Sequence, residues 1–192
     1  MGSRPTPDFA ELIARLAVAL EAKRIPFMLI GGQAVLLHGE PRLTQDVDVT
    51  LGVGPDRVRD LLDVCEALGL QPLPEDPVAF VRETFVLPAA EPETGLRLDL
   101  IFSTTPYEAQ AIERAVLVDV GKREVPFASA EDLVLHKLFA GRPRDVEDAA
   151  GVVRRKGPEL DWEYLDRWAR EFAVIPGRED LPAQLAGLRA DV

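Results

Sequence analysis

The sequence predicts an α/β (α+β) fold, with a small mixed β-sheet, flanking helices and a helical C-terminal region. Up to residue 128, short apolar segments suited to strands alternate with amphipathic segments suited to helices. From residue 129 onward, apolar residues recur at helical spacing alone. We therefore expect a sheet-containing region over residues 1–128 and a helical region over residues 129–192 packed on it.

The composition is that of an acidic globular protein. The chain has 192 residues, 47% of them hydrophobic, which is enough for a packed core. It carries 22 Lys and Arg against 33 Asp and Glu, a formal charge of -11. A negative chain repels polyanions at long range, which weakens a general nucleic-acid-binding function but leaves room for a local basic patch. We expect no DNA partner.

Cysteine content and hydropathy predict a cytoplasmic protein. Cys65 is the only cysteine, so the sequence provides no internal disulfide and no thiolate metal cluster. No apolar run approaches the ~20 residues of a membrane span, and the N-terminus lacks the apolar segment of a signal peptide. We expect no membrane partner.

The first region contains both kinds of element. A helix is expected over residues 6–25, where Thr6, Pro7 and Asp8 precede apolar residues at helical spacing. Further helices are expected over residues 33–39 and 55–70. Strands are expected over residues 27–30, 46–53, 79–87 and 95–102, with a Pro- and Glu-rich loop at 88–94 and a hairpin over 115–127 that turns at Gly121 and Lys122.

The second region is expected to be helical throughout. Ser129 and Asp132 form a capping box at the start of its first helix, with Asp132 in the Glu/Gln position. Pro143 lies in the first turn of the next helix. A third helix is expected over residues 161–172, and a last one near the end of the chain.

Aromatic and histidine side chains of the second region are expected to be structural. Trp162, Tyr164 and Trp168 recur at helical spacing, which favours a place in the core over a base-stacking platform. His136 lies off the apolar stripe of its helix, so we expect it at the surface.

Two aspartates interrupt a strand whose other residues are apolar. Residues i and i+2 of a strand point to the same side, so Asp46 and Asp48 share one face. Two carboxylates this close repel each other, and a shared proton or a divalent cation relieves the repulsion. The spacing suits Mg²⁺, which takes one or two carboxylates and leaves positions for phosphates. The alternative is an edge strand that turns this face to solvent.

A third carboxylate, Asp99, lies in another strand of core-like composition. Leu98 and Leu100 form one face of that strand, and Asp99 lies on the other. If this strand lies beside that of Asp46 and Asp48, three carboxylates meet. Asp99 could then complete the metal site and take the proton from an acceptor hydroxyl.

Gly31 and Gly32 lie between an expected strand and an expected helix. Such a junction directs free backbone N–H groups and the positive end of the helix toward an anion. Two glycines are a weak signal alone, because turns use glycine widely. Glycines before a helix, then an Asp pair on the next strand, then a third Asp form a far more specific order.

This order resembles that of nucleotidyltransferases of the DNA polymerase β superfamily: a Gly-Gly/Ser turn, Asp-x-Asp on the following strand, and a later Asp. Residues 31–49, GGQAVLLHGEPRLTQDVDV, are similar to the AbiEii-like branch, known as toxin components of type IV toxin–antitoxin systems. Residues 129–153 resemble that branch's C-terminal motif, a Lys on one helix and Arg-Asp-x-x-Asp on the next. The resemblance covers residues 26–153 and implies the nucleotidyltransferase fold.

The resemblance implies roles for the matching residues of the sheet region. Gly31 and Gly32 would cradle the triphosphate. Asp46 and Asp48 would hold Mg²⁺, with two ions expected, and Asp99 would be the third carboxylate of the metal site. Many relatives have Ser where this chain has Gly32, so the backbone contact survives and a hydroxyl is lost.

Four further residues match the family motifs. Lys137 would approach the nucleotide phosphates, and Asp145 matches a carboxylate that AbiEii-like enzymes need. Arg42 and Thr44 match the family lead-in R-x-T-x-D-x-D and are assigned to nucleotide binding. Lys137 also falls on the apolar stripe of its helix, and an inward ammonium is costly unless it meets an anion. The alternative is a lysine that snorkels at the edge or pairs structurally with Asp145 or Asp148.

The sequence therefore predicts a Mg²⁺-dependent enzyme that moves a nucleoside monophosphate from an NTP to an acceptor hydroxyl and releases pyrophosphate. The resemblance favours RNA, with a tRNA 3′ end as acceptor and a cognate antitoxin as partner, whereas the charge of -11 opposes it. A protein hydroxyl or a small molecule such as an antibiotic is the alternative acceptor. A non-catalytic nucleotide-binding or antitoxin-like partner on the same fold ranks second, because all three carboxylates are present.

Overall fold

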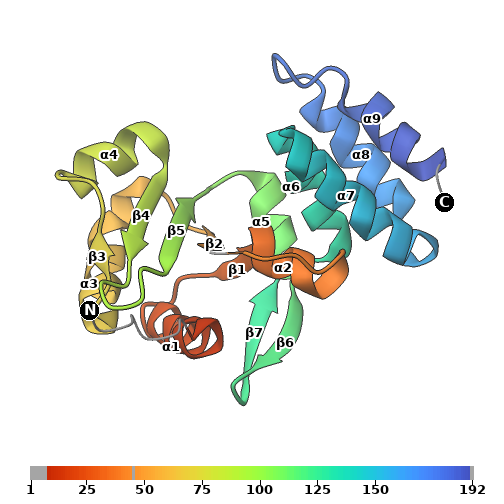
Figure 1. Ribbon diagram of the computed structural model, residues 1–192. Helices are drawn as coiled ribbons and strands as arrows, with labels where there is room; N and C mark the ends of the chain where they lie inside the picture. The colour runs from red at the N-terminus through yellow and green to blue at the C-terminus, as the bar shows by residue number, and fades with distance from the viewer. Residues whose placement is uncertain (1–7, 45, 191–192) are drawn as a thin grey trace. The chain divides into compact units, whose positions relative to one another are not determined.

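The computed structural model describes residues 8–44 and 46–190, and it has the mixed α/β fold that the sequence predicts (Figure 1). Within the described residues, seven strands form one sheet in the order β3-β4-β5-β2-β1-β7-β6. The pairs β2–β5 and β1–β7 are parallel, and the remaining pairs are antiparallel. The strands are β1 (Phe27–Ile30), β2 (Asp46–Leu51), β3 (Gln71–Pro72), β4 (Val86–Ala90), β5 (Arg97–Phe102), β6 (Val116–Val120) and β7 (Arg123–Phe127).

The chain divides into two compact units. The sheet unit comprises Met1–Gly32 and Thr44–Phe127, and the helical unit comprises Gln33–Leu43 and Ala128–Val192. Helix α2 (Gly31–His38) spans the division. The other helices of the sheet unit are α1 (Phe9–Ala22), η1 (Pro55–Arg57), α3 (Val58–Leu68), α4 (Pro77–Thr84) and α5 (Pro106–Glu113). Those of the helical unit are α6 (Ala130–Ala140), α7 (Pro143–Lys156), η2 (Gly157–Glu159), α8 (Trp162–Phe172) and α9 (Leu181–Ala190).

The core of the sheet unit explains why β2 and β5 are central strands. On one face of each, Val47, Val49, Leu98 and Leu100 have no exposed surface. Burying an aliphatic side chain of this size contributes about 1.5–3 kcal/mol, so this face is fixed inward. Because side chains alternate along a strand, the opposite face of both strands carries the carboxylates.

Local signals at the ends of elements act as the sequence predicts. Asp8 caps α1, accepting a hydrogen bond from the Glu11 backbone N–H at 3.0 Å, whereas Thr6 and Pro7 lie outside the described residues. Gly121 and Lys122, with φ of 60° and 70°, turn the β6–β7 hairpin. Such φ values suit a tight turn between antiparallel strands.

The strand expected over residues 79–87 is wrong. The segment forms α4, and β4 begins only at Val86 and continues through Pro88 into the expected loop. The physical reason lies just upstream, where Asp76 accepts a hydrogen bond from the Ala79 backbone N–H at 3.0 Å and Pro77 opens the first turn. Phe85, at φ 60°, then ends the helix. Helix α5 and strand β3 were not expected either.

The helical unit is anchored by the capping box of α6. The Ser129 hydroxyl accepts from the Asp132 backbone N–H at 3.1 Å and donates to the Asp132 carboxylate at 2.7 Å. The hydroxyl of Tyr164, on α8, donates to the other Asp132 oxygen at 2.7 Å. Pro143 occupies the first turn of α7, as expected. In residues 8–44 and 46–190, no helix has the length and apolar character needed to cross a membrane.

Candidate active site

Three carboxylates lie on one face of two adjacent central strands. The register pairs Asp48 directly with Asp99 and Asp46 with Arg97. Asp46 is exposed, and Asp48 and Asp99 are half-buried. Because β2 lies between β5 and β1, the edge-strand interpretation of the Asp pair is wrong. Directly paired residues of a sheet face the same side, so the carboxylates share one surface.

The electrostatic setting of these carboxylates favours a cation. Burial raises the pKa of Asp99 above its ordinary value; Arg97 opposes the rise, and the negative charge of Asp46 adds to it. Within the described residues, the side chains of Asp46 and Asp99 make no hydrogen bond or ion pair with another side chain. A cation between them would relieve their repulsion.

The donor set fits a hard divalent cation by its chemistry. Carboxylate oxygens are the ligands that Mg²⁺ prefers, and the pKa of Asp99 already responds to the charge of Asp46. The side chains are not drawn together into a ligand cage: the described part of the chain holds no group of three His, Cys, Asp or Glu arranged around a metal position. Their common face and register are the features that fit.

Gly31 brings the backbone against Asp48. Gly31 directly follows Ile30, which is paired with Asp48 across β1 and β2. Its φ is 61°, and a Cβ there would come within 2.7 Å of the Asp48 Cγ. Both constraints require glycine. The two glycines form the first residues of α2, so the expectation that they precede the helix is wrong, and the helix begins two residues earlier than expected.

Thr44 occupies the space beside Gly32. A Cβ at Gly32 would come within 2.7 Å of the Thr44 Cβ, and nearer still to its hydroxyl. The Thr44 hydroxyl donates to the Asp46 backbone carbonyl at 3.3 Å. A serine at position 32 would therefore collide with Thr44, whose hydroxyl lies beside Gly32.

The other predicted site residues gather in the helical unit. Lys137 donates to Asp145 at 2.7 Å and lies 2.9 Å from Asp148, and all three are buried, at 8%, 9% and 7% exposure. Arg42 donates two hydrogen bonds of 2.8 Å to the Asp148 carboxylate. Burial alone would raise the pKa of Asp148, but the hydrogen bonds from Arg42 and Lys137 outweigh it and lower the pKa.

This cluster matches the alternative in which Lys137 pairs structurally with Asp145 or Asp148. The inward position of Lys137 is confirmed, and both acidic partners lie within its unit. One oxygen of Asp145, Oδ2, is buried without a hydrogen-bond partner among the described residues. It retains the capacity to accept a hydrogen bond from a ligand.

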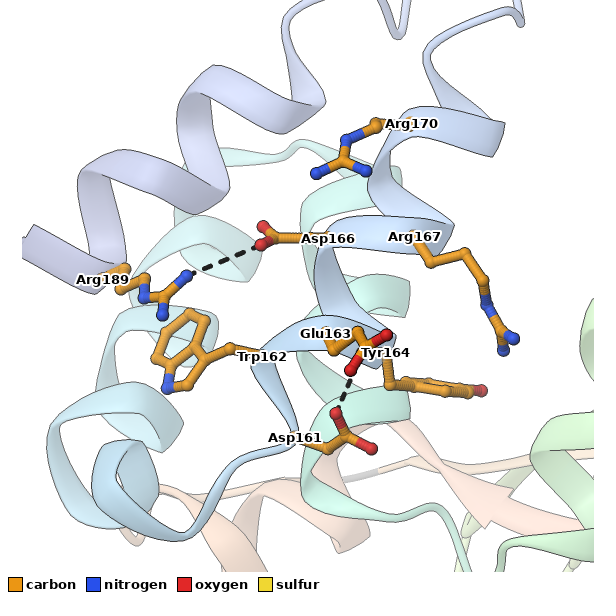
Figure 2. Close-up of a pocket in the computed structure, with 8 residues that line it drawn as sticks. All are labelled: Asp161, Trp162, Glu163, Tyr164, Asp166, Arg167, Arg170 and Arg189. Carbon is orange, nitrogen blue, oxygen red and sulfur yellow. Dashed lines mark hydrogen bonds and ion pairs between the residues drawn. The ribbon is translucent and has the colours of Figure 1, made fainter.

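A pocket of about 540 Å³ opens between α8 and α9 (Figure 2). Arg189 lies 4.9 Å from the ring centroid of Trp162 and 3.5 Å from Asp166. Trp162 is half-buried and lines this pocket, whereas Tyr164 is buried as expected. Trp168 is half-buried as well, so the expectation of a core position holds for Tyr164 and is wrong for Trp162 and Trp168. Arg189 of this pocket therefore already contacts an aromatic ring and a carboxylate of the same unit.

His136 is half-buried, which corrects the surface position expected for it. Burial lowers its pKa to about 4; Asp132 acts against this shift and Lys137 adds to it. The apolar stripe of α6 is wider than its helical spacing indicated, because α7 and α8 both contact α6.

Sequence reasoning missed a second pocket, in the sheet unit. It has a volume of about 460 Å³ and lies between α4 and the start of β5. Phe80 of α4 and Arg97 of β5 are among its lining residues. Recognition of the Asp76-Pro77 helix start would have revealed one of its walls, α4, because a strand over residues 79–87 leaves no such wall.

Solved structures share this fold. The antibiotic-resistance factor ANT(2'')-Ia is 16% identical, with a TM-score of 0.59 over 86% of this chain and 94% of that one. A nucleotidyltransferase-like protein from Paracoccidioides brasiliensis is 16% identical, with a TM-score of 0.54 over 92% and 91%. The lincosamide antibiotic adenylyltransferase LnuA is 19% identical, with a TM-score of 0.52 over 77% and 98%. At these identities the likeness shows the fold alone.

A family model also matches the sequence, whereas no curated protein does. The model describes a "nucleotidyltransferase of unknown function (DUF6036)" and matches residues 9–181. It confirms the nucleotidyltransferase part of the resemblance; the AbiEii-like branch stays a prediction. Because the match spans nearly all of the 192 residues, this chain belongs to the DUF6036 family of nucleotidyltransferases.

Proposed function

We propose that the protein transfers a nucleoside monophosphate from an NTP to an acceptor hydroxyl, with Mg²⁺ and release of pyrophosphate. The observation that carries the proposal is the register of β2 and β5, which sets Asp48 opposite Asp99, with Asp46 on the same face and Gly31 packed against Asp48. The glycine turn, the Asp pair and the third Asp, which are separate in the sequence, thus lie together on one face of the sheet.

Each group of this surface has a role in the proposed reaction. Gly31 and Gly32, at the start of α2, present backbone N–H groups to the triphosphate. Asp46, Asp48 and Asp99 would hold two Mg²⁺ ions, which stabilise negative charge on the attacking and leaving oxygens. Asp99, whose pKa is raised, accepts the proton of the acceptor hydroxyl as its oxygen bonds to the α-phosphorus and the bond to pyrophosphate breaks.

Lys137, Asp145 and Arg42 enter the proposal through the resemblance. Their charges are balanced within the helical unit by the pairing with Asp148 and with each other. A role for Lys137 at the nucleotide phosphates and for Asp145 in catalysis is supported by the matching motif and by the buried Asp145 oxygen that lacks a partner among the described residues. Thr44 is proposed to contribute to nucleotide binding from its position beside Gly32.

Two acceptor classes are in competition. The AbiEii-like resemblance favours the 3′ end of a tRNA, in a type IV toxin with a cognate antitoxin. The charge of -11 and the known chemistry of structural relatives favour a small molecule. ANT(2'')-Ia has been solved with adenylyl-2''-tobramycin, at 18% identity and a TM-score of 0.51, and LnuA has been solved with lincomycin.

A transfer assay tests the function. The protein is incubated with each of four α-³²P NTPs and Mg²⁺, against total RNA, proteins and hydroxyl-bearing small molecules. We expect label transfer that EDTA and Asp48→Asn abolish, and that Asp119→Asn, an exposed aspartate of the β6–β7 hairpin, leaves intact. Label on no acceptor with any NTP would contradict the proposal and favour the non-catalytic partner, which should retain its binding in Asp48→Asn.

A further inference from the structure

We propose that the acceptor is a small cationic molecule with an apolar body, and that it binds in the pocket beside α4. This inference rests on the proposed function for the reaction, but its binding step can be tested separately. The pocket, of about 460 Å³, is of the size that proteins use for small ligands. We call it the α4 pocket; its lining includes Leu73, Glu75, Asp76, Phe80, Glu83, Pro88 and Arg97.

The α4 pocket begins where the row of site residues ends. Ile30, Asp48, Asp99 and Pro88 are paired in turn across β1, β2, β5 and β4. Neighbouring strands lie roughly 4.8 Å apart, so each member of this row lies about one strand spacing from the next. Gly31 follows the row at one end, and Pro88 belongs to the wall of the α4 pocket at the other.

This order places Asp99 between the two proposed substrates. The triphosphate would lie at the Gly31 end of the row, and a molecule in the α4 pocket would lie on the opposite side of Asp99. Arg97, two residues before Asp99 on the same face, also lines the pocket. An acceptor hydroxyl in the pocket therefore lies on the side from which Asp99 can take its proton.

The lining selects the chemical class of the ligand. Leu73 and Phe80 keep 47% and 38% of their surface exposed, and both line the same pocket, so together they offer an apolar wall that a ligand can cover. The rim carries Glu75, Asp76 and Glu83 against Arg97, so one positive and three negative charges give a net charge of −2. Such a rim attracts an amine and repels the phosphates of RNA.

In the proposed step, the acceptor oxygen forms a bond to the α-phosphorus and the bond between that phosphorus and the pyrophosphate oxygen breaks. The hydroxyl proton passes to Asp99, and pyrophosphate leaves. The ammonium group of the acceptor would remain at the acidic rim throughout and take no part in the chemistry.

Binding is tested on the whole protein without NTP. Tryptamine serves as the cationic apolar probe, and indole-3-propionate as its anionic counterpart, in ¹H–¹⁵N NMR titrations. We expect tryptamine to shift the amides of Leu73, Ala79 and Phe80, and indole-3-propionate to leave them in place. Equal shifts by both probes, or shifts confined to residues outside the α4 pocket, would overturn the proposal.

Matched variants separate the pocket from the rest of the sheet. Glu83→Gln should weaken tryptamine binding about threefold, in the range of an exposed ion pair, and Leu73→Ala by roughly the same factor through lost apolar contact. Glu124→Gln and Leu117→Ala, at exposed positions of the β6–β7 hairpin at the far end of the strand order, should not change it. Equal effects of the pocket and control variants would contradict the proposal.

Transfer kinetics distinguish the failure of this inference from the failure of the proposed function. With a cationic acceptor found in the transfer assay, Phe80→Ala should raise the KM for the acceptor about tenfold and leave the KM for the NTP unchanged. Label on RNA that is insensitive to Phe80→Ala would overturn the acceptor class while the nucleotidyltransferase function stands. Tryptamine binding without any transfer would overturn the function and leave the pocket.

Discussion

The helical unit and the sheet unit each hold a cluster of aspartates, and the two clusters have opposite electrostatic settings. In the helical unit, Arg42 and Lys137 surround Asp148 at 2.8–2.9 Å and lower its pKa. In the sheet unit, burial raises the pKa of Asp99, and among the described residues its side chain contacts no cation at ion-pair distance. Asp148 is thus paired with two cations, whereas Asp99 keeps a raised pKa without such a pair, which is the setting that the proposed metal site requires.

The largest expected effect is that of Asp99→Asn on transfer activity, and it tests whether the sheet cluster differs from the helical cluster. Asp99→Asn removes the proposed proton acceptor and a metal ligand, so we expect transfer to fall about 10²–10⁴-fold. The free energy of unfolding should stay the same or rise, because a partly buried carboxylate is lost. Single-turnover transfer and urea unfolding measure the two quantities. A variant that loses stability and activity together would place Asp99 with the structural cluster.

The reciprocal variant acts on stability. Asp148→Asn leaves Lys137 and Arg42 with one carboxylate fewer, and breaking such a buried pair costs about 3–5 kcal/mol. Urea unfolding at pH 7 measures this loss, with Asp166→Asn, at a 3.5 Å exposed pair with Arg189, as a control expected to cost under about 1 kcal/mol. Because the pKa of Asp148 is lowered by folding, its contribution is present at neutral pH and disappears as the pH falls through the folded pKa. Equal costs for the two variants would contradict this assignment.

His136 sharpens the comparison through pH. Folding lowers its pKa from 6.5 to about 4, so the unfolded chain takes up the proton first as the pH falls. The free energy of unfolding is therefore unaffected by this group above pH 6.5 and falls between pH 6.5 and 4, by up to roughly 3 kcal/mol. His136→Gln should flatten the dependence of the unfolding free energy on pH in this window. An unchanged slope in the variant would show that other groups cause it.

The smallest effect tests the packing beside the sheet cluster. Gly32→Ala forces its Cβ into Thr44, so we expect a loss of roughly 1–2 kcal/mol in unfolding free energy. The double variant Gly32→Ala with Thr44→Gly should recover part of it, with a coupling energy of about 1 kcal/mol. Additive losses would mean that Thr44 does not occupy the space beside Gly32.

The sheet cluster was largely predictable from sequence, and the reason is periodicity. The alternation around Asp46, Asp48 and Asp99 determines which face of its strand each aspartate occupies. Apolar neighbours such as Val47 and Leu98 occupy the other face and point into the core, so the aspartates point away from the core. Periodicity alone does not establish that the two strands are adjacent, and the structure shows that they are.

The helical segment after Asp76 was not recognised, for a related reason. Phe80, Val81, Phe85 and Val86 favour a strand by composition, and the capping hydrogen bond from Ala79 to Asp76 overrides that preference. The α4 pocket could not be read from the sequence, because its walls come from a helix, a loop and two strands that only the sheet register brings together.

The division of the chain has a consequence for fragments of this protein. Gln33–Leu43 belongs to the helical unit although it is flanked by sheet-unit residues, so the backbone passes between the units three times. His38 is bonded to the Ala128 carbonyl at 2.8 Å, Glu40 to Arg154 at 2.7 Å, and Arg42 to Asp148. A fragment ending at residue 128 would keep this segment but lose Asp148 and Arg154. Cutting the gene there would therefore yield not a minimal enzyme but a chain with an orphaned helix, and the intact protein should melt in a single cooperative transition.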